Sequence, residues 1–129
     1  MTPRPEAIKG PDVPSAIGPY SPAVRIGDLL FVSGQPGVDP STGEPAGETF
    51  GEQARQVFRN LDAVLRAGGS DPTLVVSTTV LVADVSSFAE LNELFGEFFS
   101  VNPPARMTMQ VPLPKGLLIS IGCVAAAAA

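Results

Sequence analysis

The sequence contains no histidine, and its 129 residues include one cysteine, Cys123. Histidine is the usual acid or base of ribonucleases and catalytic triads, so any chemistry here falls to other groups. A lone cysteine excludes an internal disulfide, and without a histidine or a second cysteine no structural zinc site is plausible. Cys123 lies in an apolar stretch without a nearby cation, which predicts a protonated, inert thiol in the core.

Basic residues are scarce and long apolar runs are missing. The 8 Lys and Arg residues face 13 Asp and Glu residues, the net charge is -5, and no basic cluster occurs. Nucleic-acid binding needs such a cluster to neutralise phosphates, so a nucleic acid is not an expected partner. The longest nearly apolar stretch, 117–129, is shorter than the ~18 residues of a membrane span. No secretion signal is apparent at the start, so we expect a cytoplasmic protein without a membrane partner.

The length and the 44% hydrophobic content predict a single domain over residues 1–129. Residues 1–22 contain six prolines, which cannot sustain a helix, so this segment is expected to form an extended N-terminal arm. Residues 125–129 are all alanine and are expected to form a small C-terminal tail.

Hydrophobic periodicity and turn residues predict five strands and two helices between the arm and the tail. A capping box at Thr49 and Glu52 marks the start of the first helix, and Gly68 marks its end. The order indicates an α+β fold, a mixed β-sheet with two helices on one face. The other face needs a cover, which predicts a homo-oligomer. The expected strands are 23–26, 29–32, 74–82, 105–111 and 117–124. The expected helices are 49–67 and a second one that begins after an N-cap within 84–87 and reaches about 99.

Arg106 is the most informative charge. All thirteen acidic residues precede residue 98, so Arg106 and Lys115 carry the only side-chain charges after it. An arginine on a strand that alternates with Met107 and Met109 is costly to bury unless an anion meets its planar donors, and a ligand carboxylate would do so. A distant Asp or Glu partner, or extension into solvent, would explain Arg106 as well. Lys115 lies in a proline-rich turn and is interpreted as a solvated charge.

Four further residues are candidates for a ligand site. Tyr20, the only tyrosine, can stack on a small ligand or simply pack the arm onto the domain. Ser33 and Gly34 end the second strand, where glycine permits close approach of a ligand to the backbone, although an ordinary strand exit explains both residues. The Asn92 amide can reach a backbone group or a pocket from the second helix, and a structural role is the simpler interpretation.

Several short blocks stand in a fixed order along the chain: Ile17-Gly18-Pro19-Tyr20-Ser21, Val32-Ser33-Gly34-Gln35, Gln53-Ala54-Arg55-Gln56, Asn60-Leu61, Asn92 with Phe98-Phe99, and Pro104-Ala105-Arg106. Together they resemble the RidA/YjgF family. The match spans residues 15 to about 124, and ordered blocks are far more specific than one short motif.

The resemblance implies a chorismate-mutase-like fold, a homotrimer and clefts between its subunits. It also implies hydrolysis, without cofactor or metal, of 2-imino acids such as 2-iminopropanoate and 2-iminobutanoate to 2-oxo acids and ammonia. On that hypothesis Arg106 binds the substrate carboxylate, Tyr20 of an adjacent subunit closes the cleft, and the Ser33 and Gly34 backbone orients the imine and the attacking water. The match at Asn92 adds this residue to the substrate-binding set.

The last strand departs from the family pattern. Deaminases of the family carry a glutamate there that holds or activates the water, whereas this chain has Gly122, with Ser120 two residues earlier. Loss of a positioned base typically costs ~10²- to 10⁴-fold in rate. Met107 also stands where a smaller residue is usual, which can reshape the pocket. Three hypotheses follow: an imine deaminase of altered range, a non-catalytic small-carboxylate (2-oxo acid) binding protein with a regulatory role, and a ribonuclease, which the charge and the lack of histidine disfavour.

Overall fold

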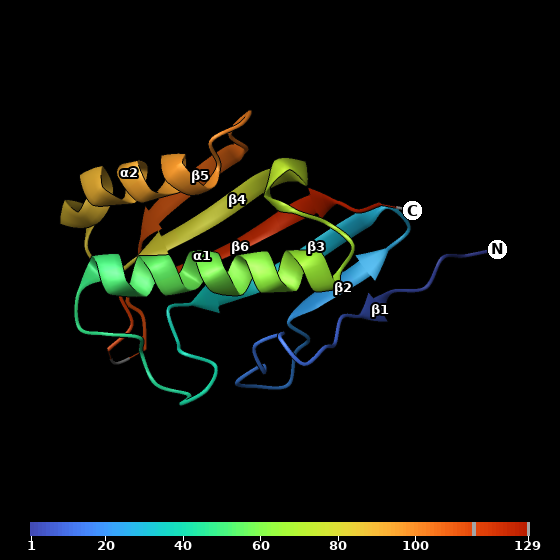
Figure 1. The fold of residues 1–129 in the computed structure, drawn as a ribbon, viewed down its shortest axis with the longest axis horizontal. Coiled ribbons are helices and arrows are strands. Elements are labelled where there is room, and N and C mark those ends of the chain that lie inside the picture. The colour runs from blue at the N-terminus through green and yellow to red at the C-terminus, as the bar shows by residue number, and fades with distance from the viewer. Residues whose placement is uncertain (115, 129) are drawn as a thin grey trace.

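The computed structural model describes residues 1–114 and 116–128. Two helices lie on one face of a mixed six-stranded sheet, as the sequence predicted, so the α+β class is confirmed (Figure 1). The strands are β1 (Glu6–Ala7), β2 (Ala23–Ile26), β3 (Leu29–Pro36), β4 (Val75–Val82), β5 (Ala105–Gln110) and β6 (Ile119–Ala126), the helices are α1 (Phe50–Ala67) and α2 (Phe88–Phe98), and short 3-10 helices span Pro72–Leu74 and Val85–Ser87. The sheet order is β1-β2-β3-β6-β4-β5.

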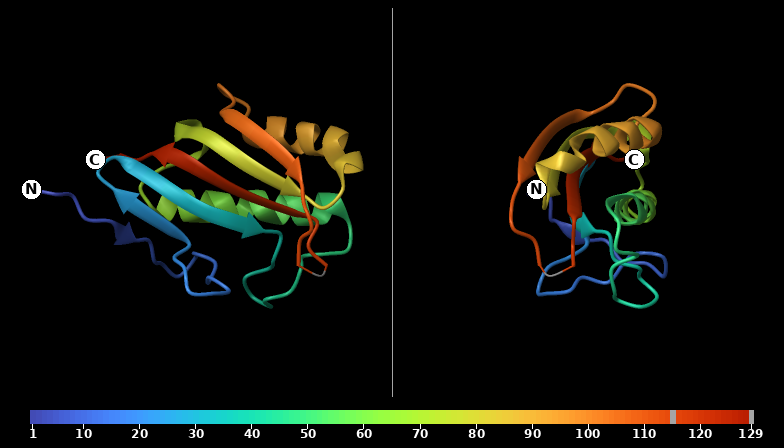
Figure 2. Two further views of the ribbon diagram at one scale, coloured as in Figure 1. Left: turned by 180° about the vertical axis from the view of Figure 1, so that it is seen from behind. Right: turned by 90° about the vertical axis from the view of Figure 1, so that its left-hand side faces the viewer.

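The connections explain why both helices lie on the same face. The β4 and β5 strands are parallel, and β3 and β4 share a direction because both pair antiparallel with β6. The α1 helix therefore joins β3 to β4, and α2 joins β4 to β5, by crossovers that move the same way across the sheet. Such crossovers are right-handed, so both helices meet the same face. The left view in Figure 2 shows the opposite face, which no helix within the described residues covers.

The predicted helix α1 begins and ends at its expected residues. The Thr49 hydroxyl accepts a hydrogen bond from Glu52 N at 3.2 Å, and Thr49 N donates to Glu52 Oε1 at 3.2 Å. At the other end, Gly68 N donates to Val64 O at 3.0 Å. These local bonds satisfy backbone groups that a helix leaves unpaired at its ends. The apolar face of the helix joins the core, whose fully buried members include Ala54, Val57, Leu61, Val64 and Leu65 from α1 and Leu30, Val80, Ile119 and Ile121 from the sheet.

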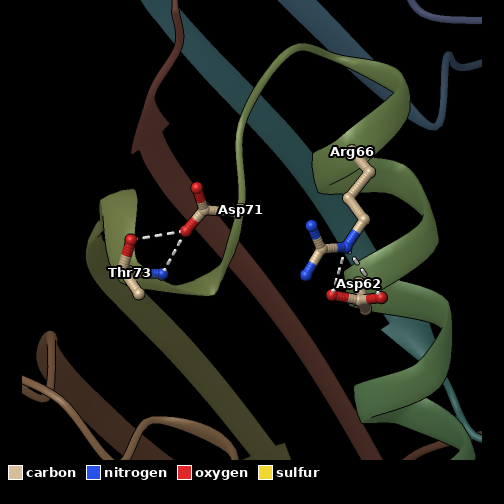
Figure 3. A network of polar contacts seen from close by, with 4 residues as sticks. All are labelled: Asp62, Arg66, Asp71 and Thr73. Carbon is tan, nitrogen blue, oxygen red and sulfur yellow. Dashed lines mark hydrogen bonds and ion pairs between the residues drawn. The ribbon is translucent and has the colours of Figure 1, made fainter.

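The last turns of α1 and the segment that follows it carry exposed polar contacts (Figure 3). Arg66 pairs with Asp62 at 3.0 Å, and this partner raises the pKa of the Arg66 guanidinium. The Asp71 carboxylate accepts a hydrogen bond from Thr73 N at 2.7 Å. Hydrogen bonds from the Thr73 side chain and backbone lower the pKa of Asp71. Because both carboxylates meet solvent, these contacts shape the exit toward β4 more than they stabilise the fold.

The bounds of two predicted strands need correction. The β3 strand continues to Pro36, because a register shift between Val32 and Gln35 lets it pair with β6 beyond the predicted end. The β6 strand spans Ile119–Ala126 rather than the predicted 117–124, so the first two residues of the predicted tail 125–129 belong to the sheet. Alanine has a low preference for strands, which is why the sequence did not predict this extension. The expected arm over residues 1–22 includes a short strand, since β1 pairs with β2.

Two further expectations concern the surface of the chain. No helix within the described residues is long and apolar enough to cross a membrane. Lys115 and Ala129 lie outside the described residues, so the interpretation of Lys115 as a solvated charge remains a prediction.

Candidate functional site

Arg106 lies on β5, the edge strand that pairs with β4. Its register partner is Thr78, which is 3% exposed beneath the helices, so Arg106 projects toward the helical side of the sheet. There the side chain meets α2. One terminal nitrogen of the guanidinium donates to Asn92 Oδ1 at 2.7 Å. The guanidinium carbon lies 4.9 Å from the ring centroid of Phe95 and 5.4 Å from that of Phe88.

These contacts leave the charge of Arg106 uncompensated. Among the described residues, no carboxylate lies within 4.0 Å of its guanidinium. The one ion pair in this part of the chain joins Arg66 to Asp62 on α1. The alternative explanation, a structural ion pair of Arg106 with a distant Asp or Glu, is therefore not seen among the described residues. A guanidinium has five N–H donors, and within the described residues Arg106 uses them for one hydrogen bond. A planar carboxylate can meet the others in pairs.

Tyr20 and Gly34 lie at a second place, where the arm passes the end of β3. Both residues line a pocket of about 150 Å³. The Ser33 hydroxyl donates to Ser21 O at 2.7 Å, which ties the arm to the strand. The Ser33 N–H is engaged as well, since it donates to Pro22 O at 3.0 Å. The Ser33 carbonyl accepts from Gln35 Nε2 at 3.1 Å and keeps a second lone pair for a ligand. The pocket is lined by Pro14, Ser15, Ala16, Ile17, Tyr20, Pro22, Gly34, Gln35, Pro36, Val38, Pro40, Gly43 and Asn60.

The register shift in β3 between Val32 and Gln35 is a β-bulge, and the small residues Gly34 and Gly122 let it lie close to β6. A Cβ atom on Gly34 would lie 2.9 Å from Ser120 Oγ, too close for any larger residue without a shift. A Cβ on Gly122 would lie 3.1 Å from Val32 O and 3.4 Å from Gly34 N. A carboxylate side chain at residue 122 would thus start beside the bulge. With glycine there, the open face has a shallow hollow lined by Phe31, Val32, Ser77, Thr79, Gly122, Cys123 and Val124.

The predicted site residues form two separate groups in one chain. Arg106 and Asn92 lie together at the β5 edge, whereas Tyr20, Ser33 and Gly34 lie at β3. Strand register aligns Arg106 with Thr78 and Cys123, and Cys123 pairs with Val32 at the start of the bulge. Along the strand axis, Arg106 and the bulge are therefore at the same height. Across the sheet, however, β3 and β5 are three strand spacings apart, about 14 Å. A small imino acid cannot touch both groups of one chain.

Sequence reasoning missed three residues near Arg106. Phe88 and Phe95 stand four residues before and three after Asn92, so helical spacing alone would have placed them on its face. Thr108 follows Arg106 by two residues and therefore shares its side of the strand. Its Oγ1 is buried and has no hydrogen-bond partner among the described residues. The same part of the chain contains no cluster of acidic, cysteine or histidine residues that could hold a metal ion.

Comparison with known proteins decides the family. A family model described as Endoribonuclease L-PSP matches residues 11–127. The human 2-iminobutanoate/2-iminopropanoate deaminase is 46% identical over 113 residues, which cover 87% of this chain and 82% of the human protein. The chain belongs to the RidA/YjgF family. A RutC family protein, y4sK of Sinorhizobium fredii, is 48% identical over 92% of this chain and 95% of its own length.

Solved RidA/YjgF structures share the whole fold. RidA from the Antarctic bacterium Psychrobacter sp. has a TM-score of 0.89 and 41% identity, over 94% of this chain and 98% of that one. The YjgF gene product of E. coli has a TM-score of 0.88 and 37% identity, over 94% and 98% of the two chains. The likeness therefore includes the sheet, both helices and the edge strand that carries Arg106.

Proposed function

We propose that this RidA/YjgF protein hydrolyses 2-imino acids, such as 2-iminobutanoate and 2-iminopropanoate, to 2-oxo acids and ammonia. The observation that carries the proposal is the Arg106 guanidinium, which is fixed by Asn92 at 2.7 Å while no described carboxylate neutralises it. The charge fits the carboxylate that every 2-imino acid carries. The names of the human, rat and mouse relatives, each called 2-iminobutanoate/2-iminopropanoate deaminase, support the same substrate class.

In the proposed reaction, water adds to the imine carbon and forms a C–O bond. The nitrogen takes up protons and leaves as ammonia when the C–N bond breaks, and the carbon becomes the carbonyl of the 2-oxo acid. Arg106 would hold the carboxylate, and the backbone at Ser33 and Gly34 would orient the imine and the water. Imines hydrolyse readily in water, so positioning and charge complementarity can supply a modest acceleration.

The proposed site needs a second copy of the chain. Arg106 and the pocket at Tyr20 and Gly34 are too far apart in one subunit to hold one small substrate. The sheet face opposite the helices also exposes large apolar side chains, including Phe31 at 45% and Met107 at 60%. A homotrimer would cover this face and bring the β5 edge of one subunit to the arm of the next. Tyr20 of the adjacent subunit would then close the cleft.

A second candidate function rests on Gly122. Without a carboxylate there, the water would depend on backbone groups or on the Ser120 hydroxyl, which lies beside the bulge. The alternative is a non-catalytic 2-oxo acid binding protein with a regulatory role. The description of the family model names an endoribonuclease, but the net charge of -5 and the absence of histidine argue against RNA as the substrate.

The deciding experiment measures hydrolysis of 2-iminobutanoate produced by a threonine dehydratase. The proteins are the wild type, Arg106→Ala, Gly122→Glu and, as a matched control with a Cβ but no carboxylate, Gly122→Ala. We expect wild-type acceleration, its loss in Arg106→Ala, and a further gain of ~10²-fold or more in Gly122→Glu from a positioned base. If only Gly122→Glu accelerates hydrolysis, the protein is a binder. Its wild type should then bind 2-oxobutanoate in calorimetry, and Arg106→Ala should not.

A further inference from the structure

Three neutral groups on one face of α2 surround the Arg106 guanidinium. Phe88, Asn92 and Phe95 recur at helical spacing, and both rings lie within cation–π distance of the guanidinium carbon, at 5.4 Å and 4.9 Å. The Asn92 oxygen accepts the one hydrogen bond described for the Arg106 side chain. The arginine is therefore restrained from several directions, although no carboxylate among the described residues pairs with it.

Aromatic rings restrain an arginine in a way that a carboxylate cannot. A carboxylate partner would occupy two N–H donors and cancel the charge, so a ligand carboxylate would have to compete with it. A ring face attracts the cation through its quadrupole and uses no N–H donor. The acidic residues of α2, Glu90, Glu93 and Glu97, are exposed and lie outside ion-pair distance of Arg106. The charge and most donors thus remain available.

Phe88 is the more informative of the two aromatic residues, because packing in the core does not explain its position. Its side chain is 42% exposed, whereas Phe95 is 6% exposed and also packs against Phe58 and Phe99. A large apolar residue at the exposed start of α2 gains little from burial, yet its ring faces the guanidinium. Phe88 therefore allows the contact with Arg106 to be tested with little disturbance of the core.

We propose that Phe88 and Phe95 are positioning residues, which hold Arg106 in the orientation that binds the substrate carboxylate and leave its N–H donors free for it. The proposal rests on the proposed function, because it assigns Arg106 the carboxylate of a 2-imino or 2-oxo acid. Phe95 contributes to the core as well, so its replacement would change stability too. The test therefore uses Phe88.

The variants are Phe88→Leu, which keeps an apolar side chain without a ring, and Phe88→Trp, which keeps an aromatic face. Val85→Ala is the control, because Val85 is 59% exposed just before α2 and makes no described contact with Arg106. Calorimetry measures the Kd for 2-oxobutanoate, and imine hydrolysis gives KM and kcat. We expect Phe88→Leu to weaken binding and raise KM about 3- to 5-fold, the worth of one exposed cation–π contact. Phe88→Trp should restore both values, with kcat little changed.

A spectroscopic measurement reports on the same contact without any ligand. The Nε–H resonance of Arg106 in a ¹⁵N spectrum is assigned by its absence in Arg106→Ala. Loss of the ring current should move it in Phe88→Leu, and Val85→Ala should leave it in place.

The outcomes separate the two proposals. If the wild type binds 2-oxobutanoate through Arg106 but does not hydrolyse imines, the deaminase proposal fails and the Kd series still measures the role of Phe88. If Phe88→Leu matches the wild type in Kd and in the Arg106 resonance, the positioning role is wrong. A loss that Phe88→Trp does not restore would also overturn it, because the effect would then be one of packing. Wild-type protein that neither binds 2-oxobutanoate nor hydrolyses imines would overturn both proposals.

Discussion

Single residues of this chain owe their chemistry to their surroundings. The sequence predicted that Cys123 is a core residue with an inert thiol, and its burial at 6% exposure is confirmed. The loss of hydration on burial raises the pKa of the Cys123 thiol to about 12. Arg106 is the opposite case, because its neighbours are neutral and leave its charge available to a ligand. The local sequence is apolar around both residues, so the contacts made across the fold distinguish them.

The raised pKa of Cys123 predicts how stability changes with pH. Between about pH 9 and pH 12 the unfolded thiol loses its proton while the folded one keeps it, so the unfolded state binds fewer protons. The free energy of unfolding must then fall as pH rises through this window, and this contribution is fully retained below about pH 9. Urea unfolding at pH 8 and pH 10 should show a smaller fall for Cys123→Ala than for the wild type. Equal falls would mean that the thiol is not the source.

At the scale of elements, one buried glutamine joins the helix layer to two loops. Gln53 on α1 is 1% exposed, and its Nε2 donates to Gly47 O at 3.0 Å and to Gly116 O at 2.7 Å. Its Oε1 accepts from Leu118 N at 2.8 Å. The segment before α1 and the connection into β6 are thereby fixed to the same helical turn. A polar side chain on the buried face of α1 is tolerated because all its groups are paired.

Replacement of Gln53 should therefore be costly. Gln53→Leu keeps the volume but leaves three backbone groups without their partner, and we expect a loss of about 2 to 4 kcal/mol in the free energy of unfolding. Arg55→Leu is the control on the exposed face of the same helix, and it should change stability by less than about 0.5 kcal/mol. Chemical denaturation of both variants gives the comparison. A small effect of Gln53→Leu would show that water satisfies the freed groups.

At the scale of the whole molecule, the sheet has one covered face and one open face. Successive residues of each strand point alternately to the core and to the open face. Exposed residues of the open face include Phe31, Thr79 and Met107, and Thr79 lies beside Met107 across the sheet. An exposed apolar face of this kind is typical of association surfaces. The homotrimer remains a prediction, and the separation of the two groups of site residues makes the proposed activity depend on it.

The predicted assembly can be tested by one charge on the open face. The wild type should have a mass in solution three times the chain mass of 13.3 kDa by light scattering. Phe31→Glu should dissociate it to single chains and abolish imine hydrolysis, because a carboxylate in a buried apolar interface is not solvated. Val85→Glu places the same charge on an exposed residue of the helical layer and should leave the mass unchanged. Assembly that survives in Phe31→Glu would exclude this face as the interface.

The sequence by itself determined the parts that local interactions specify. The capping box at Thr49, the stop at Gly68 and the apolar periodicity between them define α1 through contacts a few residues apart. The lack of acidic residues after Glu97 likewise identified Arg106 as a cation without a local partner.

Only the tertiary structure decided which distant segments meet. Insertion of β6 between β3 and β4, the bulge beside Gly122 and the extension of β6 over Ala125 and Ala126 depend on pairing partners far away in sequence. The same holds for the site, where a helix crossover brings Phe88 and Phe95 onto Arg106 and strand order separates it from Tyr20. Long-range pairing leaves little trace in local sequence because the preferences of each strand are satisfied by many partners.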